Sequence, residues 1–201
     1  MTEVATEYGP ARLHVDLPDT APISLLVLGH GAGGDVTAVD IVALRNAAVR
    51  ARVAVVRVTQ PYRLAGRRAP APARQLDAAF TTAVDAARRY VPAGLPLVVG
   101  GRSSGARVAC RTAAALGAAG VVALAFPLHP PGKPDRSRAP ELPADLPTLV
   151  VNGDRDPFGV PDGGGDIEVR VRPGEGHELR RDPAGAADEV VRWLGTHGWA
   201  A

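Results

Sequence analysis

The chain has 201 residues, 46% of them hydrophobic, and a formal net charge of +2 at pH 7. This length suits a single domain, residues 1–201, with a substantial core, and no apolar tract approaches the ~20 residues that a membrane span requires. The small charge and the lack of a basic and apolar leader predict a cytoplasmic protein with neither a nucleic-acid partner nor a membrane partner.

Cysteine and basic residues narrow the class further. Cys110 is the only cysteine, so no internal disulfide is possible, and its position inside a predicted helix indicates a small buried side chain. Lys133 is the only lysine among 23 basic residues, and the chain is rich in alanine, glycine and proline. This composition is typical of a GC-rich bacterial genome.

The first part of the chain alternates strand and helix patterns. Residues 12–17 alternate polar and apolar side chains, which predicts a half-exposed edge strand. Residues 23–28 form a nearly continuous apolar run, which predicts a buried strand. Residues 37–50 carry apolar side chains at mostly helical spacing, and residues 52–58 return to strand character. Together these segments predict a β-α-β unit.

The middle of the chain continues the alternation. Residues 60–72 are a loop rich in proline and arginine. A long helix is predicted next, with one apolar face formed by Leu76, Phe80, Val84, Ala87 and Val91. A strand, a helix and a further strand are then predicted at residues 97–100, 104–116 and 121–126.

The last third begins with an irregular segment. Residues 127–146 contain six prolines and too little periodicity for a helix or a strand. Two strands are predicted at residues 148–151 and 167–172, and Asp182 followed by Pro183 indicates the N-cap of a final helix. The whole pattern predicts an α/β fold with a mostly parallel sheet of about seven strands, helices on both faces, no cap domain, and a site at the carboxyl ends of the strands.

The most informative motif is Gly101-Arg102-Ser103-Ser104-Gly105, between a predicted strand and a predicted helix. It fits the G-x-S-x-G pattern, in which small residues two positions on either side of the serine let two backbones cross in a strained turn. Centring the pattern on Ser104 fails, because Arg102 and Ala106 then occupy those positions. The motif therefore predicts Ser103 as an exposed nucleophile, against the plainer alternative of a tight turn with two solvated serines.

The earlier turn Gly29-His30-Gly31-Ala32-Gly33-Gly34 has two functional interpretations. It matches the dinucleotide-binding pattern G-x-G-x-x-G, but no acidic residue occurs from residue 41 to residue 76 to hold an NAD ribose, so only NADP stays open. Alternatively, the Ala32 N–H and the Ser104 N–H form an oxyanion hole. In that case we expect His30 to brace the loop at the edge of the pocket and not to act as the base.

An acid and a histidine follow in later loops. Both Asp154 and Asp156 follow a predicted strand, and the proline after Asp156 favours an extended backbone that aims its carboxylate across the sheet. Of the five histidines, only His177 lies in a glycine-flanked loop between the last strand and the last helix. The order Ser103, Asp156, His177, each after its own strand, predicts a catalytic triad. A solvated loop residue is the alternative for each acid and for the histidine.

Positive side chains flank the predicted site. Arg102 beside the nucleophile, together with Arg63 and Lys133, suggests a pocket that tolerates an anionic group, although plain surface arginines are the simpler interpretation in an arginine-rich chain. His129 opens the irregular segment and is a candidate for the pocket lining. We predict neither a metal site nor a cofactor.

Four strings carry a resemblance to a known family: His-Gly-Ala-Gly-Gly at His30, Gly-Gly-Arg-Ser-Ser-Gly-Ala-Arg at Gly100, Leu-His-Pro-Pro-Gly-Lys-Pro at Leu128 and Gly-Asp-Arg-Asp-Pro-Phe-Gly at Gly153. With them, about residues 25–194 resemble a compact α/β-hydrolase. More narrowly, the chain is similar to a dienelactone-hydrolase-like family of bacterial small hydrolases and eukaryotic testis-expressed and chromatin-complex subunits, the KANL3/Tex30 group. The resemblance implies the fold and the triad positions but little about the substrate.

Three function classes remain open. The first is a serine hydrolase that cleaves a small-molecule ester, lactone or thioester through an acyl-enzyme. The second is a non-catalytic interaction protein with the hydrolase fold, because the resembling family includes assembly components. The third is an NADP-binding oxidoreductase. The sequence leaves the oligomeric state open.

Overall fold

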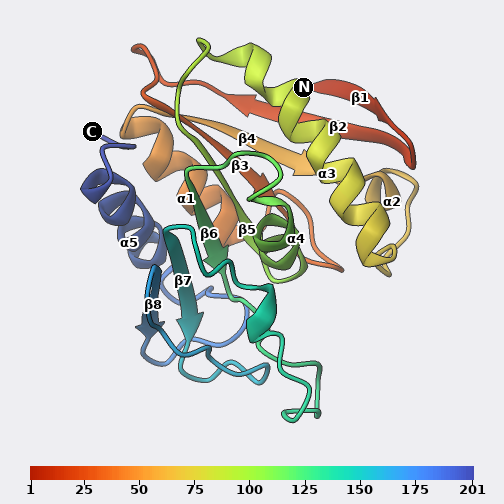
Figure 1. Cartoon of the computed structure of the whole chain (residues 1–201), viewed down its shortest axis with the longest axis vertical. Coiled ribbons are helices and arrows are strands. Elements are labelled where there is room, and N and C mark those ends of the chain that lie inside the picture. The colour runs from red at the N-terminus through yellow and green to blue at the C-terminus, as the bar shows by residue number, and fades with distance from the viewer.

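The computed structural model describes all 201 residues and contains one eight-stranded sheet with helices on both faces (Figure 1). The strands lie in the order β1-β2-β4-β3-β5-β6-β7-β8, and only the β1–β2 and β2–β4 pairs are antiparallel. The predicted α/β fold with a mostly parallel sheet is confirmed. The strands are β1 (Thr2–Thr6), β2 (Gly9–Asp16), β3 (Ser24–Gly29), β4 (Val53–Thr59), β5 (Leu97–Arg102), β6 (Gly120–Leu124), β7 (Thr148–Gly153) and β8 (Ile167–Arg172).

Two pairs of long helices cover the sheet. The first pair, α1 (Val39–Arg50) and α5 (Pro183–Thr196), closes an apolar cluster of 20 buried residues on one face. The second pair, α3 (Ala73–Ala87) and α4 (Ser104–Thr112), closes a cluster of 27 on the other face. Every position of β3, β4, β6 and β7 is buried, since helices cover both sides of these strands.

The sheet has one strand more than the predicted number of about seven. β1 pairs antiparallel with β2, so β1 is the edge strand and β2 is an inner one, and the edge position predicted for residues 12–17 is wrong. Intermediate and exposed residues alternate along the five residues of β1, a pattern too short and too weak to stand out in the sequence.

The long helix α3 ends earlier than the predicted apolar face, which reaches Val91. A 3₁₀ turn, Arg88–Tyr90, follows the helix, and Val91 is extended with φ −132° and ψ 157°. Pro92 comes next, and the residue before a proline is driven out of the helical region. Val91 still packs against the same apolar cluster, so its side chain is covered without being helical.

Loops, and no inserted domain, border the carboxyl ends of the strands. Residues 60–72 contain only the short helix α2 (Pro61–Leu64), and residues 127–146 are irregular except for the 3₁₀ turn Ala139–Glu141. The predicted start of the last helix is confirmed, because the Asp182 side chain accepts a hydrogen bond from the Gly185 N–H at 2.9 Å. No helix combines the length and the apolar character needed to cross a membrane.

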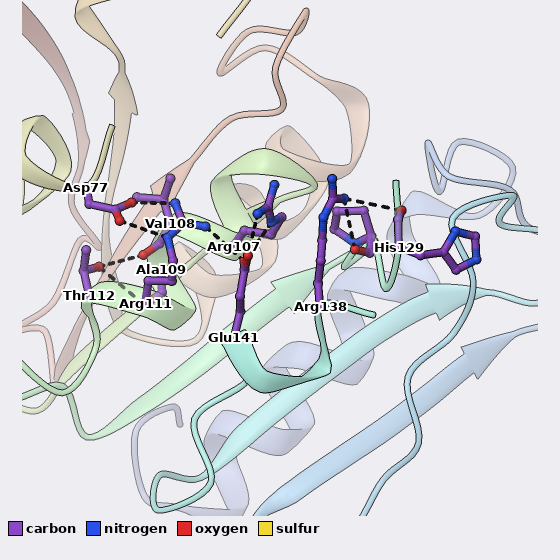
Figure 2. Close-up of polar contacts among 10 residues, drawn as sticks. Asp77, Arg107, Val108, Ala109, Arg111, Thr112, His129, Arg138 and Glu141 are labelled. Atoms are coloured by element: carbon purple, nitrogen blue, oxygen red, sulfur yellow. Dashed lines mark hydrogen bonds and ion pairs between the residues drawn. The ribbon is translucent and has the colours of Figure 1, made fainter. Parts of the chain in front are cut away.

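A partly buried charge network fastens the irregular segment to the helices (Figure 2). Arg107 on α4 donates two hydrogen bonds to the Glu141 carboxylate, at 2.7 and 2.5 Å. Arg111, one turn further on, reaches both Glu141 and Asp77 on α3. Burial alone would raise the pKa of Glu141, but the hydrogen bonds and charges of Arg107 and Arg111 outweigh it and lower that pKa. Arg138, nearby, donates to the carbonyl oxygens of Pro127 and His129.

We expect Glu141→Gln to lower the free energy of unfolding by about 1–2 kcal/mol near neutral pH, because two guanidinium groups lose their anion. The folded-state pKa of Glu141 lies below its usual value of 4.5, so this stabilisation is present above pH 4.5 and is lost as the pH falls through the folded-state pKa. Urea unfolding of the wild type and the variant at pH 7 and at about pH 3.5 measures both effects.

Glu3→Gln is the matched control, because Glu3 pairs with Arg12 on the surface, where both side chains are at least 40% exposed. Such a pair contributes little. Equal losses in Glu141→Gln and Glu3→Gln, or a loss in Glu141→Gln that does not shrink in acid, would contradict this role for the network.

Candidate active site

A sharp turn between β5 and α4 holds Ser103 in a strained backbone conformation, with φ 54° and ψ −112°. A Cβ atom added to Gly101 would lie 2.6 Å from the Gly29 carbonyl oxygen, and one added to Gly105 would lie 2.5 Å from the same oxygen. These distances are too short for any side chain, so both glycines of the predicted motif are required by the crossing of two backbones. The turn lifts Ser103 to the carboxyl edge of the sheet.

Three side chains from three separate loops meet at this edge. His177 Nε2 lies 2.9 Å from Ser103 Oγ, and His177 Nδ1 lies 2.8 Å from Asp156 Oδ2. The residues follow β5, β7 and β8, which end at the same side of the parallel sheet. The structure thus brings together Ser103, Asp156 and His177, the three residues that the sequence motif and loop positions single out.

The surroundings of Asp156 fix its orientation. The side chain is fully buried, and Oδ1 accepts the Phe158 N–H at 2.9 Å, which leaves Oδ2 for His177. The Phe158 ring also packs against the His177 imidazole, with ring centroids 4.4 Å apart. Asp154 instead accepts the Gly174 N–H at 2.7 Å and shapes the adjoining loop, as the sequence suggests.

Hydrogen bonds of His30 and Tyr62 hold the glycine loop after β3, residues 29–34, in place. The backbone N–H of Gln60 donates to His30 Nε2 at 3.1 Å, so the His30 proton resides on Nδ1, which donates to the Gly31 carbonyl at 2.8 Å. Burial lowers the pKa of His30, which keeps this imidazole neutral. Tyr62 donates to the Ala32 carbonyl at 2.7 Å. His30 therefore holds the loop and makes no hydrogen bond to Ser103.

Two backbone N–H groups near Ser103 have no acceptor within the fold. The Ala32 N–H makes no hydrogen bond in the chain. Ser104 is the first residue of α4, and the first N–H groups of a helix have no intrahelical partner. An N–H group without an acceptor carries a partial positive charge and is able to donate a hydrogen bond to an oxyanion.

Arg102 forms an ion pair with Asp40, an acidic residue of α1. Its Nε lies 3.2 Å from Asp40 Oδ2, and the Asp40 side chain is 1% exposed. Nη2 donates to the His177 carbonyl at 3.3 Å, and a Cβ atom on Gly31 would lie 3.1 Å from Nη1. Arg102 thus links α1, the glycine loop and the histidine loop, and its charge is balanced by Asp40. Burial raises the pKa of Asp40, an effect that the charge of Arg102 partly reverses.

The remaining pocket candidates make no polar contact with the triad. Arg63 on α2 donates to the Arg67 carbonyl at 3.0 Å. His129 Nδ1 lies 3.0 Å from the Pro130 carbonyl, and its ring borders Gly159. Lys133 is exposed in a turn that begins at Pro130. None of these three side chains forms a hydrogen bond or ion pair with Ser103, Asp156 or His177.

Several supporting residues carry no recognisable sequence signal. Glu175 is 3% exposed, and its Oε1 accepts the Asp182 N–H at 2.5 Å, which joins the histidine loop to α5. Asp40, Gln60 and Tyr62 also hold the site, yet their partners are distant in the sequence. No group of three or more His, Cys, Asp or Glu side chains is arranged to hold a metal ion.

The geometry of the first glycine turn differs from a dinucleotide-binding turn. In such sites the glycine-rich turn opens directly into a helix whose N-terminus faces the pyrophosphate. Here α1 begins only at Val39, and the loop is anchored through His30 to Gln60. This arrangement disfavours the NADP interpretation.

Comparison with known proteins finds a matching family and several solved structures with a similar fold. The sequence profile of a family described as "Alpha/beta hydrolase domain" matches residues 22–169. The structure is similar to an alpha-beta serine hydrolase homologue from Coxiella burnetii, with 16% identity, 96% of each chain covered and a TM-score of 0.78. No curated protein matches the chain by sequence.

Two further solved structures cover nearly the same length. An a/b serine hydrolase without lid from Xanthomonas campestris is 20% identical over 98% of this chain and 93% of its own, with a TM-score of 0.77. Est1E from Butyrivibrio proteoclasticus, solved with ferulic acid bound, is 15% identical over 98% of each chain, with a TM-score of 0.77. At these identities the likeness shows the fold.

We expect Arg102→Gln to lower the free energy of unfolding by about 3 kcal/mol at neutral pH, because Asp40 is left buried without a cation. The folded-state pKa of Asp40 lies above its usual value of 3.8, so ionised Asp40 disfavours folding at pH values above 3.8, and the variant loses stability as the pH rises from about 4 to 7. Urea unfolding at both pH values tests this.

The double variant Arg102→Gln/Asp40→Asn removes the buried charge and recovers part of the loss. A double variant as unstable as Arg102→Gln alone, or a loss that does not depend on pH, would show that the charge of Asp40 is not the cause.

Proposed function

This chain belongs to the alpha/beta hydrolase family, and we propose that it is a serine hydrolase that cleaves small carboxylic esters, lactones or thioesters. The observation that carries the proposal is the continuous hydrogen-bonded chain from Ser103 Oγ through His177 to Asp156. An oriented base next to a strained serine is the arrangement that activates a weak nucleophile. Two structural neighbours described as serine hydrolases support the same reaction class.

The proposed reaction has two steps. His177 Nε2 accepts the proton of Ser103 as Oγ attacks the substrate carbonyl carbon, and the Ala32 and Ser104 N–H groups hold the resulting oxyanion. His177 then donates that proton to the departing alcohol or thiol, which leaves an acyl group on Ser103. A water molecule, deprotonated by His177, releases the acid. Asp156 holds the imidazole in orientation and stabilises its positive charge in both steps.

The proposal also includes the subfamily, the extent of the domain, the cellular location and the residues of the outer pocket. The four motif strings support a place in the KANL3/Tex30 group, and the continuous sheet supports a single hydrolase domain over residues 1–201. We also propose a cytoplasmic bacterial enzyme with a small-molecule substrate. Arg63, His129 and Lys133 remain candidates for the outer pocket. Arg102 is a positioning residue in this scheme, because Asp40 balances its charge.

Active-site labelling tests the proposal directly. We expect a fluorophosphonate to add one adduct to the wild type, seen as a mass increase of the intact protein, and to add none to Ser103→Ala. Ser104→Ala is the matched control, because it removes the neighbouring hydroxyl but keeps the backbone N–H, and it should still be labelled.

Each other outcome would contradict a different part of the proposal. An unlabelled wild type would contradict the activated serine and favour the non-catalytic interaction protein. An adduct that persists in Ser103→Ala and disappears in Ser104→Ala would identify Ser104 as the nucleophile. A change in NADPH fluorescence on mixing with the wild type would favour the oxidoreductase.

A further inference from the structure

Two adjoining hollows lie between the serine turn and the start of α3. The nearer hollow has a volume of about 10 Å³ and is bordered by Ser104 and Phe80. The farther one has a volume of about 100 Å³ and is bordered by Tyr8. Gln60, Tyr62 and Leu76 line both hollows, so the two share a wall. Ser104 is next to the proposed nucleophile, so the nearer hollow begins one residue away from the serine that would carry the acyl group.

The walls of the passage combine apolar and polar side chains and limit its capacity. Tyr62, Leu76, Phe80 and Val108 supply aromatic and aliphatic surface. An apolar cavity of about 150 Å³ holds benzene, which has six carbon atoms. A hollow of about 100 Å³ therefore has room for about four heavy atoms, and the nearer hollow is only as large as one water molecule. The passage encloses a short acyl chain, and a longer chain would have to extend beyond it.

Gln60 stands at the shared wall with an unused hydrogen-bond acceptor. The residue is 5% exposed, and its side-chain Oε1 is buried without a partner. Nε2 donates to the Leu76 carbonyl at 3.1 Å, which decides the orientation of the amide, because the carbonyl accepts only from the NH₂ group. The backbone N–H is held by His30. The side chain is thus fixed with an unpaired oxygen at the wall of the passage, which the polar side chains of Arg67 and Gln75 also line.

A buried acceptor without a donor is costly, and buried polar atoms in folded proteins nearly always have partners. An occupant that carries a hydrogen-bond donor would satisfy Oε1 when it fills the passage. A hydroxyl group supplies one hydrogen-bond donor and adds a single heavy atom, which the small volume admits.

We propose that this passage is the acyl subsite, and that Gln60 Oε1 selects short acyl groups that carry a hydroxyl, as in esters or thioesters of hydroxybutanoic acid. The inference rests on the proposed serine hydrolase function. Gln60 acts on specificity through binding, and no bond to it forms or breaks. The hydroxyl of the acyl chain donates to Oε1, while Tyr62, Leu76 and Val108 enclose the carbon atoms.

The test compares kcat/KM for p-nitrophenyl butanoate, 3-hydroxybutanoate and octanoate. We expect the hydroxybutanoate to exceed the butanoate by about tenfold, because the analogue without a hydroxyl leaves Oε1 unpaired. The octanoate should fall at least about tenfold below the butanoate, because its chain exceeds the hollow. Gln60→Leu should remove the preference for the hydroxyl, and Gln75→Leu, the same change at a half-buried position of the farther hollow, should keep it.

If Gln60→Leu does not fold, the kcat/KM ratios of the wild type for the three esters still test the proposal. Equal values for the butanoate and the hydroxybutanoate, undiminished hydrolysis of the octanoate, or a preference that survives in folded Gln60→Leu would each overturn the proposal. Fluorophosphonate labelling of the same samples distinguishes failure of the acyl subsite from failure of the hydrolase function. Enzyme that is labelled but lacks the expected kcat/KM ratios refutes the acyl subsite alone. Enzyme that is not labelled refutes the hydrolase function.

Discussion

The contact between the end of β3 and the start of α4 is the constraint on which the site depends. The Gly29 peptide lies so close to Gly101 and Gly105 that neither can carry a Cβ atom. This contact forces the turn that gives Ser103 its strained φ of 54° and directs Oγ toward His177. Gly29 also begins the glycine loop, so one backbone crossing positions both the serine and the N–H groups around it.

Buried polar contacts hold the loops around this crossing in place. His30 joins the glycine loop to Gln60 after β4, and Arg102 joins it to α1 and to the histidine loop. Glu175 ties the histidine loop to α5. These contacts give buried polar and charged groups a partner, so the arrangement is set when the chain folds. A site organised in this way needs little rearrangement when charge develops on a substrate.

The sequence predicts the parts of this arrangement that depend on near neighbours. Glycine spacing selects Ser103 over Ser104, Pro157 favours Asp156, and flanking glycines favour His177. The parts that depend on distant packing are not predictable in this way. In the sequence, Arg102 resembles a cation that is free to bind a substrate. In the fold, Asp40 of α1 lies beside it and pairs with it. Likewise, the β1 strand becomes recognisable only through its pairing with β2, and Gln60 resembles an ordinary loop residue.

We propose that His177 acts as a base toward Ser103 because Asp156 holds its proton on Nδ1. Nitrogen-15 NMR of the histidine side chains measures the tautomer directly, with His177→Gln to assign the signal. For neutral His177 we predict a proton on Nδ1 and a free Nε2, and we predict that Asp156→Asn changes this tautomer. A neutral His177 protonated on Nε2 in the wild type would be unable to accept the Ser103 proton, and this result would refute its role as the base.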